Sequence, residues 1–379
     1  MPSAVAVVPS VPTSQLGRPF SDRPATTPNK PGLSGAATAL SLALIARRGS
    51  ELLLLLFKGK PLVPFDNAGE EKQRSAAAWR GTVTLVALYV GAAGLAAGWG
   101  VASGGGPFAA ASKPLTQPSA PAAAVAVYLV GLHALRAHVA ALAPKERVRL
   151  EAHLQPVVAA HNALLSVWSA ALLAAMAAQL LPLLTQPGGD FMAAWCDPKP
   201  HALATHPLVG LCYLNYLVKW YELADTAFLV LRGRPTPLLH VFHHAATLVL
   251  CWLQLVENTA CQWLPIVLNL TVHVLMYGYY AAATLGIRCW WKRYLTTLQI
   301  VQFSIGVPSC VAALVLRISA ERGWGLLGAG VNTWCRGTHR AAYVGIGLLG
   351  AYLLLFLQLY RCACMTLPRA SFTPVGMLL

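Results

Sequence analysis

Three histidines with spacing suited to catalysis occur in one apolar segment. His240, His243 and His244 stand at positions i, i+3 and i+4, so they share one face of an α-helix. Imidazole can bind a metal ion, transfer protons near neutral pH, or attack an activated acyl group as a nucleophile. A single histidine on an apolar face is more often a core residue, whereas three on one face indicate a site.

The next apolar segment carries a second polar stripe. Asn269, His273, Tyr277 and Tyr280 recur at spacings of four, four and three residues, with Met276 beside them. A helix that faces lipid would not carry these groups, so we expect the stripe to face the interior of a helix bundle. For Asn269 and the tyrosines, the alternative is a seam of hydrogen bonds between helices.

Charged side chains occupy the segment before the histidines. Lys219, Glu222 and Thr226 share one helix face, and Asp225 lies one position round. Two carboxylates can therefore balance an intramembrane cation, and we expect Lys219 to pair with Glu222. A structural ion network and a substrate site both remain open for this group, because buried charges must be compensated whatever their purpose.

Neutral amides form the last polar group. Thr296, Gln299 and Gln302 are spaced by three residues. Their amides suit a polar ligand or an orienting role beside catalytic groups, and hydrogen bonding between helices is the alternative.

The composition places these motifs in a membrane. Of 379 residues, 56% are hydrophobic and 11% charged, and the mean hydropathy is +0.57, whereas soluble domains carry about 25% charged residues. The net charge of +15 would suggest nucleic acid in a soluble chain. Here Lys and Arg flank apolar segments, where they orient helices, so we expect a polytopic protein in a lipid bilayer and no nucleic-acid partner.

Segments near the roughly twenty apolar residues needed to cross a bilayer recur from residue 81 onward. The expected spans are 81–104, 122–143, 154–184, 207–231, 239–256, 262–285, 293–318 and 341–361. The chain is expected to divide into a disordered tail (1–80), an extra transmembrane helix with a Gly/Pro/Ala-rich linker (81–121), a catalytic membrane domain (122–365) and a cytosolic tail (366–379).

Together the four polar motifs resemble the ELO family of very-long-chain fatty acid elongases. A lone H-x-x-H-H is weak evidence, but four motifs in this order are strong evidence. They are K-x-x-E-x-x-D-T at 219–226, H-x-x-H-H at 240–244, N-x-x-x-H-x-x-M-Y-x-Y-Y at 269–280 and T-x-x-Q-x-x-Q-F at 296–303. The resemblance covers about residues 122–365 and implies an all-α bundle of seven membrane helices around a substrate tunnel. Residues 81–104 would then add an eighth helix.

The resemblance also implies a reaction, in which acyl-CoA and malonyl-CoA yield 3-ketoacyl-CoA, carbon dioxide and CoA, without a tightly bound cofactor or a metal. His243 is then the expected nucleophile, forming an acyl-imidazole. His240 and His244 would transfer protons or orient it, and His273 would assist decarboxylation or stabilise the enolate. The remaining motif residues are expected to bind substrate: Lys219, Glu222, Asp225, Thr226, Asn269, Met276, Tyr277, Tyr280, Gln299 and Gln302.

Substrate length would be set by the closed end of the tunnel, which the sequence does not locate. The flanking residues favour saturated or monounsaturated chains. The expected location is the endoplasmic reticulum membrane with a cytosolic C-terminus; a plastid is the less favoured alternative. Candidate partners are the reductase and dehydratase of the elongation cycle, and a homodimer is a candidate assembly.

Two other classes compete with an elongase. Di-iron desaturases and hydroxylases also use H-x-x-H-H, and His133 with His138 could serve as a first histidine box. A transporter would explain intramembrane charge but needs a route to both faces, and no internal repeat is evident. Against the di-iron class, the remaining histidines are scattered: His153, His161, His201, His206 and His339.

The cysteines predict one covalent link. Cys196 and Cys335 both fall in loops predicted on the lumenal, oxidising side, so we expect a disulfide between them. Cys251 follows His244 by seven residues on a similar face. It is therefore the rival nucleophile, although we interpret it as a packing residue.

Overall fold

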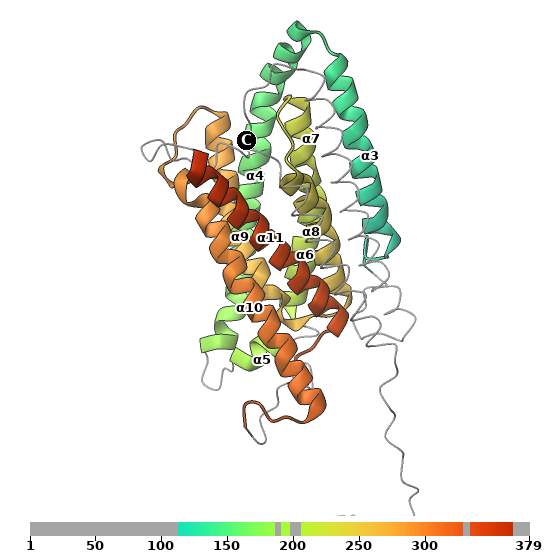
Figure 1. Ribbon diagram of the computed structural model, residues 1–379, viewed down its shortest axis with the longest axis vertical. Helices are drawn as coiled ribbons and strands as arrows, with labels where there is room; N and C mark the ends of the chain where they lie inside the picture. The colour runs from blue at the N-terminus through green and yellow to red at the C-terminus, as the bar shows by residue number, and fades with distance from the viewer. Residues whose placement is uncertain (1–112, 186–190, 198–205, 329–333, 367–379) are drawn as a thin grey trace, which may run out of the picture. The chain divides into compact units, whose positions relative to one another are not determined.

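The computed structural model describes residues 113–185, 191–197, 206–328 and 334–366. These residues form helices and connecting turns, and no β-strand occurs among them (Figure 1). The helices are α3 (Ser119–Ala141), α4 (Pro144–Thr185), α5 (Phe191–Cys196), α6 (Pro207–Tyr221), α7 (Leu223–Leu231), α8 (Leu238–Val256), η3 (Ala260–Gln262), α9 (Trp263–Thr284), η4 (Trp290–Tyr294), α10 (Leu295–Arg322) and α11 (His339–Thr366). The expected all-α fold is confirmed for this part of the chain.

Six helical segments are long and apolar enough to cross a membrane: Ser119–Ala141, Pro144–Thr185, Leu238–Val256, Ala260–Thr284, Trp290–Arg322 and His339–Arg361. Each corresponds to a predicted span, and the protein is a multi-pass membrane protein. The count of seven spans is not established, because the predicted span 207–231 is divided between α6 and α7, which have 15 and 9 residues. The predicted tail 1–80 and extra span 81–104 lie outside the described residues.

The division between α6 and α7 is a tightened turn at Glu222. Glu222 keeps right-handed helical torsions, with φ −62° and ψ −17°, and its amide donates to the carbonyl of Val218 at 2.9 Å. The amide of Asp225 then donates to the carbonyl of Glu222, three residues back, at 3.1 Å, as in a 3₁₀ turn. Lys219, Glu222 and Asp225 therefore stay on adjoining faces of one nearly continuous rod.

The long helices pack in a ring. α4 packs along α9, α9 along α10, α10 along α11, and α11 along α8. α8 packs against α6, and α6 and α7 return to α4, which closes the ring. α3 packs against α7 and α8 and lies at the edge of the bundle in Figure 1. Side chains on the inner faces of these helices therefore meet in the centre of the bundle.

Helix α8 is the most enclosed member of the bundle. In its most apolar window 72% of the residues are buried, compared with 22–33% in the other candidate spans. Ala245 and Ala246 follow directly after the histidines and are fully buried, and their small side chains allow neighbouring helices to approach closely. The histidine motif is thus carried by the helix best shielded from the bundle surface.

A disulfide bond and a side-chain ion pair stabilise one end of the bundle. The Cys196–Cys335 disulfide joins the end of α5 to the segment before α11. Arg336 pairs with Asp197 and donates to the side-chain oxygen of Asn258 at 2.7 Å. Gly337 adopts a φ of +135°, and a side chain there would meet the Cα of Thr259 at 3.2 Å. These contacts hold the α8–α9 and α10–α11 connections against α5.

Candidate active site

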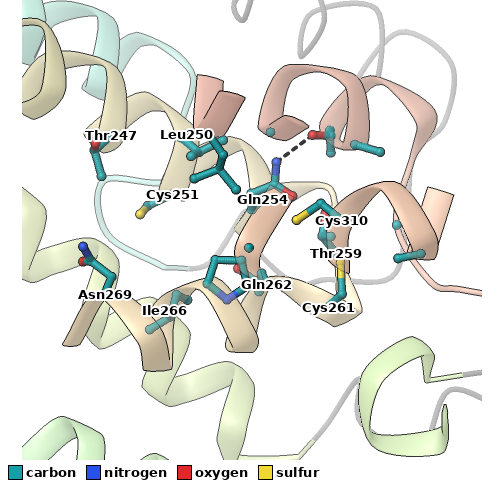
Figure 2. A pocket seen from close by; sticks show the side chains of 18 of the residues that line it. Thr247, Leu250, Cys251, Gln254, Thr259, Cys261, Gln262, Ile266, Asn269 and Cys310 are labelled. Atoms are coloured by element: carbon teal, nitrogen blue, oxygen red, sulfur yellow. Dashed lines mark hydrogen bonds between the residues drawn. The ribbon is translucent and has the colours of Figure 1, made fainter. Parts of the chain in front are cut away.

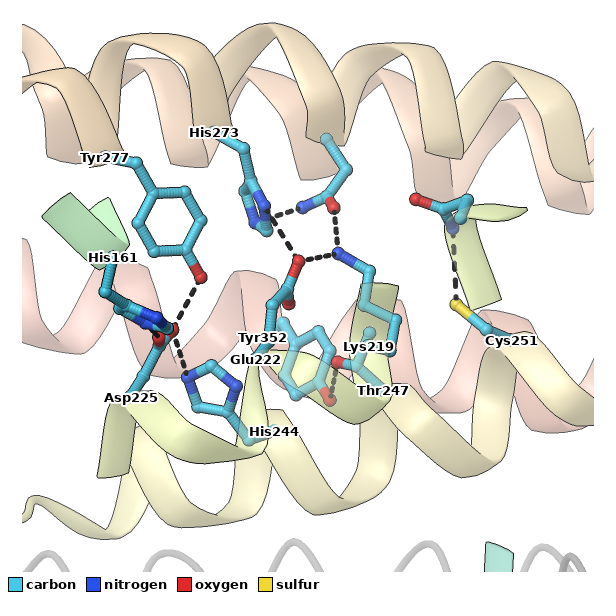
Figure 3. Close-up of polar contacts among 12 residues, drawn as sticks. His161, Lys219, Glu222, Asp225, His244, Thr247, Cys251, His273, Tyr277 and Tyr352 are labelled. Atoms are coloured by element: carbon cyan, nitrogen blue, oxygen red, sulfur yellow. Dashed lines mark hydrogen bonds and ion pairs between the residues drawn. The ribbon is translucent and has the colours of Figure 1, made fainter. Parts of the chain in front are cut away.

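Glu222 is the centre of a buried polar cluster that joins α6 to α9 (Figure 3). Lys219 Nζ lies 2.8 Å from Glu222 Oε1 and donates to Asn269 Oδ1 at 3.1 Å. Asn269 Nδ2 donates to His273 Nε2 at 3.1 Å. His273 Nδ1 lies 3.4 Å from Glu222 Oε1, so the ring proton of neutral His273 belongs on Nδ1, facing the carboxylate. The pair expected between Lys219 and Glu222 is present.

Asp225 is the centre of a second cluster, one helical turn further along the chain. His161 Nε2 lies 2.6 Å from Asp225 Oδ1, and the Tyr277 hydroxyl donates to Asp225 Oδ2 at 2.6 Å. His244 Nε2 lies 3.6 Å from the same Oδ2 atom, and His161 Nδ1 bonds the hydroxyl of Tyr221 at 3.0 Å. The carboxylate therefore connects α4 and α9 to the histidine face of α8 (Figure 3).

His161, which the sequence motifs do not include, belongs to the site. It comes from α4, is 6% exposed and has partners on both ring nitrogens. The available signal was its position well inside the predicted span 154–184, where an imidazole needs partners. The sequence alone did not say which helix would supply them.

The three histidines of α8 form the face that the spacing predicts. The ring centroids of His240 and His244 are 4.5 Å apart, and those of His243 and His244 are 5.6 Å apart. Tyr352 of α11 packs its ring 4.8 Å from that of His243 and donates its hydroxyl to the His243 carbonyl at 3.2 Å. Each of the three imidazoles has one buried nitrogen without a hydrogen-bond partner among the described residues: His240 Nε2, His243 Nδ1 and His244 Nδ1. These nitrogens are available for proton transfer or nucleophilic attack.

Two cavities meet at this face. The larger extends from Lys219 and His243 to Arg336 at the disulfide end, and Figure 2 shows Leu250, Cys251 and Ile266 in its lining. The smaller is lined by all three α8 histidines, His273 and Tyr280. Four residues line both cavities and mark the junction between them: His243, Asn269, Gln302 and Phe303.

All but two of the predicted catalytic and substrate-binding residues line these cavities. Glu222 lies behind the lining, against Lys219 and His273. Thr226 lies outside both linings: it is fully buried, and its hydroxyl hydrogen-bonds the Tyr128 hydroxyl of α3 at 2.6 Å. It lies one turn beyond Glu222, on the side of α7 that packs against α3, and thus acts as a contact between helices.

Of the rival residues, Cys251 shares the larger cavity with His243, whereas His133 and His138 lie elsewhere. Cys251 lines the larger cavity, where Asn215 Nδ2 donates to its sulfur at 3.8 Å. His133 and His138 lie on α3 and line neither of the two cavities. Among the residues that the structure describes, no three His, Cys, Asp or Glu side chains are grouped as a metal site would require.

The chain is similar to proteins named as fatty acid elongases. It is 40% identical over 200 residues to putative fatty acid elongase 1 of Schizosaccharomyces pombe, covering 53% of this chain and 58% of the relative. It is 37% identical over 215 residues to putative fatty acid elongase 2 of the same yeast, covering 57% of each. It is 36% identical over 153 residues to fatty acid elongase A of Dictyostelium discoideum, covering 39% of this chain and 54% of the relative.

These matches span little more than half the length of each relative. The profile of the ELO family, described as the GNS1/SUR4 family, matches residues 113–366. That range contains all four motifs and every residue that lines the two cavities. The chain therefore belongs to the ELO (GNS1/SUR4) family.

Proposed function

We propose that this protein catalyses the condensing step of fatty acid elongation, as a 3-ketoacyl-CoA synthase. Acyl-CoA and malonyl-CoA would be converted to 3-ketoacyl-CoA, carbon dioxide and CoA. Membership of the ELO family and the names of the relatives support elongation. The observation that carries the proposed chemistry is the position of His243 at the junction of two cavities, the smaller of which is also lined by His240, His244 and His273.

The two cavities suit the two parts of an acyl thioester. The larger cavity is lined by apolar side chains such as Leu250, Ile266 and Leu349 and would hold the acyl chain, with a gain of about 0.8 kcal/mol for each methylene buried. The smaller cavity is lined by Asp225, His273 and the three α8 histidines and would take the thioester. The reacting carbonyl then lies beside His243.

The chemistry divides into two steps at one nucleophile. His243 would attack the thioester carbonyl, and CoA would leave as a thiol with the ring proton, which leaves an acyl-imidazole. Malonyl-CoA would then enter, lose its carboxylate as carbon dioxide, and attack the acyl carbon as an enolate. Covalent catalysis of this kind lets one chamber serve two CoA esters in turn.

Neighbouring polar groups suit the enolate step. The ring of His273 lines the smaller cavity between Asn269 and Glu222. To stabilise charge on the enolate oxygen it would carry a proton on Nε2, in place of the hydrogen bond that Nε2 accepts from Asn269. Gln302 lines both cavities, and its Oε1 atom is buried without a hydrogen-bond partner in the described part of the chain. A buried amide left open in this way suits a ligand that supplies the missing bond.

The test uses purified protein in detergent, a panel of acyl-CoA lengths and radiolabelled malonyl-CoA. We expect release of carbon dioxide and formation of 3-ketoacyl-CoA with wild type, and no product with His243→Ala. Cys251→Ala is the matched control and should retain activity. Activity lost in Cys251→Ala but kept in His243→Ala would move the nucleophile to the cysteine. Absence of product at every chain length would refute the proposal.

A further inference from the structure

The larger cavity is polar at both of its ends and mainly apolar between them. On α8 and the turn after it, the lining runs from His243 through Leu250 to Thr259. The lining residues of α9 and α10 follow the same order, so apolar side chains surround the middle of the cavity. The polar lining residues of the disulfide end are Thr259, Gln262, Arg317, Arg336 and Thr338.

Thr259 is the residue at this end whose hydroxyl is left open. It is 7% exposed, and its Oγ1 atom is buried without a hydrogen-bond partner among the described residues. A side chain at Gly337 would come within 3.4 Å of that oxygen, so the glycine leaves the hydroxyl uncovered. The Thr247 hydroxyl, midway along the cavity, already bonds the Tyr352 hydroxyl at 2.9 Å. A buried hydroxyl without a partner suits a ligand that supplies the missing bond.

The cations at the disulfide end already have anionic partners. Arg317 Nε donates to Glu321 Oε1 at 2.9 Å, and Arg336 pairs with Asp197. A carboxylate on a ligand would have to compete with these side chains. A neutral hydroxyl can donate to Thr259 or accept from it without adding charge. This end of the cavity therefore suits an uncharged hydrogen-bonding group.

The distance between the two polar ends suits a long acyl chain. An α-helix rises about 1.5 Å per residue, so His243 and Val256, the last residue of α8, lie about 20 Å apart along the helix. An extended chain advances about 1.2 Å per bond, so roughly sixteen carbons cover this distance. Figure 2 shows Asn269 and Thr259 on opposite sides of the cavity.

We propose that the larger cavity accepts acyl-CoA whose ω carbon carries a hydroxyl, and that Thr259 recognises this hydroxyl. The inference rests on the proposed function and adds a substrate class to it. With the thioester beside His243, the chain passes Leu250 and its terminal hydroxyl bonds Thr259 Oγ1. Thr259 thus determines specificity and takes no part in bond making at His243. A chain that ends in a methyl group leaves the Thr259 hydroxyl buried without a partner, which is unfavourable.

The experiment compares acyl-CoAs of equal carbon number whose ω carbon carries a hydroxyl, a carboxylate or no substituent. Purified full-length protein in detergent receives each substrate with radiolabelled malonyl-CoA, and kcat/KM for 3-ketoacyl-CoA formation is measured over a range of chain lengths. The readout is the ratio of kcat/KM for the hydroxylated and unsubstituted chains. Both values come from one preparation, so the ratio does not depend on the amount of folded protein.

Three variants complete the experiment. Thr259→Val removes the hydroxyl and keeps the shape of the side chain, whereas Thr259→Ser keeps the hydroxyl. The matched control is Thr271→Val, the same change at an exposed position of α9 whose hydroxyl bonds the Val267 carbonyl.

In wild type we expect the hydroxylated chain to be used at least as well as the unsubstituted one at the length that reaches Thr259. Shorter chains should lose this preference, because their hydroxyl stops in the apolar part of the cavity. Thr259→Val should lower the ratio about tenfold, near the upper limit for one hydrogen bond, and Thr259→Ser should retain most of it. Thr271→Val should keep the wild-type ratio, and the ω-carboxylate should be the poorest substrate.

A wild type that prefers the unsubstituted chain at every length, or an unchanged ratio in Thr259→Val, would overturn the inference, and the Thr259 hydroxyl would then bond only water. A preference for the ω-carboxylate would also overturn it, in favour of recognition by the arginines. These outcomes presuppose product, so they leave the proposed function standing. Absence of product from all three substrate classes would instead refute the proposed function, and the inference with it.

Discussion

At the scale of residues, Glu222 and Asp225 divide the site between them. Glu222 accepts a hydrogen bond from Lys219 and faces His273. Asp225 accepts from Tyr277, contacts His161 and faces His244. Each carboxylate therefore orients one imidazole toward the smaller cavity, in the way that second-layer carboxylates orient histidines in other sites.

The Lys219–Glu222 pair gives the first prediction. Both side chains are buried, so Lys219→Met leaves a buried carboxylate without its cation, at a cost of about 3–5 kcal/mol. Adding Glu222→Gln removes that charge and should recover part of the loss. Thermal unfolding in detergent measures both variants. A double variant less stable than Lys219→Met alone would contradict this account of the pair.

Thr226 is predicted to affect stability and not activity, since its hydroxyl bonds the Tyr128 hydroxyl and no residue that lines the cavities. Thr226→Val should leave the rate of 3-ketoacyl-CoA formation unchanged and lower stability by about 1–3 kcal/mol, because a buried hydroxyl loses its partner. Tyr128→Phe, which breaks the same bond from α3, is the matched comparison. A selective loss of activity in Thr226→Val would return this residue to the substrate site.

At the scale of elements, α8 and α11 form a wall of the larger cavity. Gly345 of α11 lines that cavity, and a side chain there would meet Gln254 Nε2 of α8 at 3.1 Å. Gln254 Nε2 already donates to the Ala341 carbonyl at 2.7 Å, so the amide has little freedom to move. The cavity is therefore open beside Gly345 only because glycine has no side chain.

Gly345→Leu should therefore shorten the acyl chains accepted. Each methylene excluded costs about 0.8 kcal/mol, or roughly fourfold in kcat/KM for the longest substrates. Gly347→Leu on the same helix is the control, because a Cβ at Gly347 would meet nothing within 4 Å. The chain-length profile of 3-ketoacyl-CoA products measures the change. An unaltered profile in Gly345→Leu would show that the acyl chain lies elsewhere.

At the scale of the whole molecule, the two ends of the bundle differ in chemistry. One end holds the Cys196–Cys335 disulfide, and its arginines pair with carboxylates, as in Arg336–Asp197 and Arg340–Glu257. The other end carries the basic α9–α10 connection, with Arg288, Lys292 and Arg293. Disulfides form in oxidising compartments, and positively charged loops are enriched on the cytosolic side. Both rules therefore predict a lumenal disulfide end and a cytosolic α9–α10 connection.

This orientation is testable with single cysteines. Ile287 lies in the basic connection and Leu326 in the connection before α11, and both are exposed. In sealed microsomes an impermeant maleimide added outside should label Ile287→Cys, and should label Leu326→Cys only after permeabilisation. The reverse pattern would place the disulfide end in the cytosol.

Hydropathy and helical spacing predicted the membrane class, the positions of the long helices and the three-histidine face, because both are local properties of the chain. The sequence also indicated the pairing of Lys219 with Glu222, which lie one turn apart. Tertiary structure alone brought His161 to Asp225, turned Thr226 toward Tyr128 and made His243 the junction of two cavities. These relations depend on how helices far apart in the chain pack together. The spacing of polar residues within one helix does not specify which other helices that helix contacts.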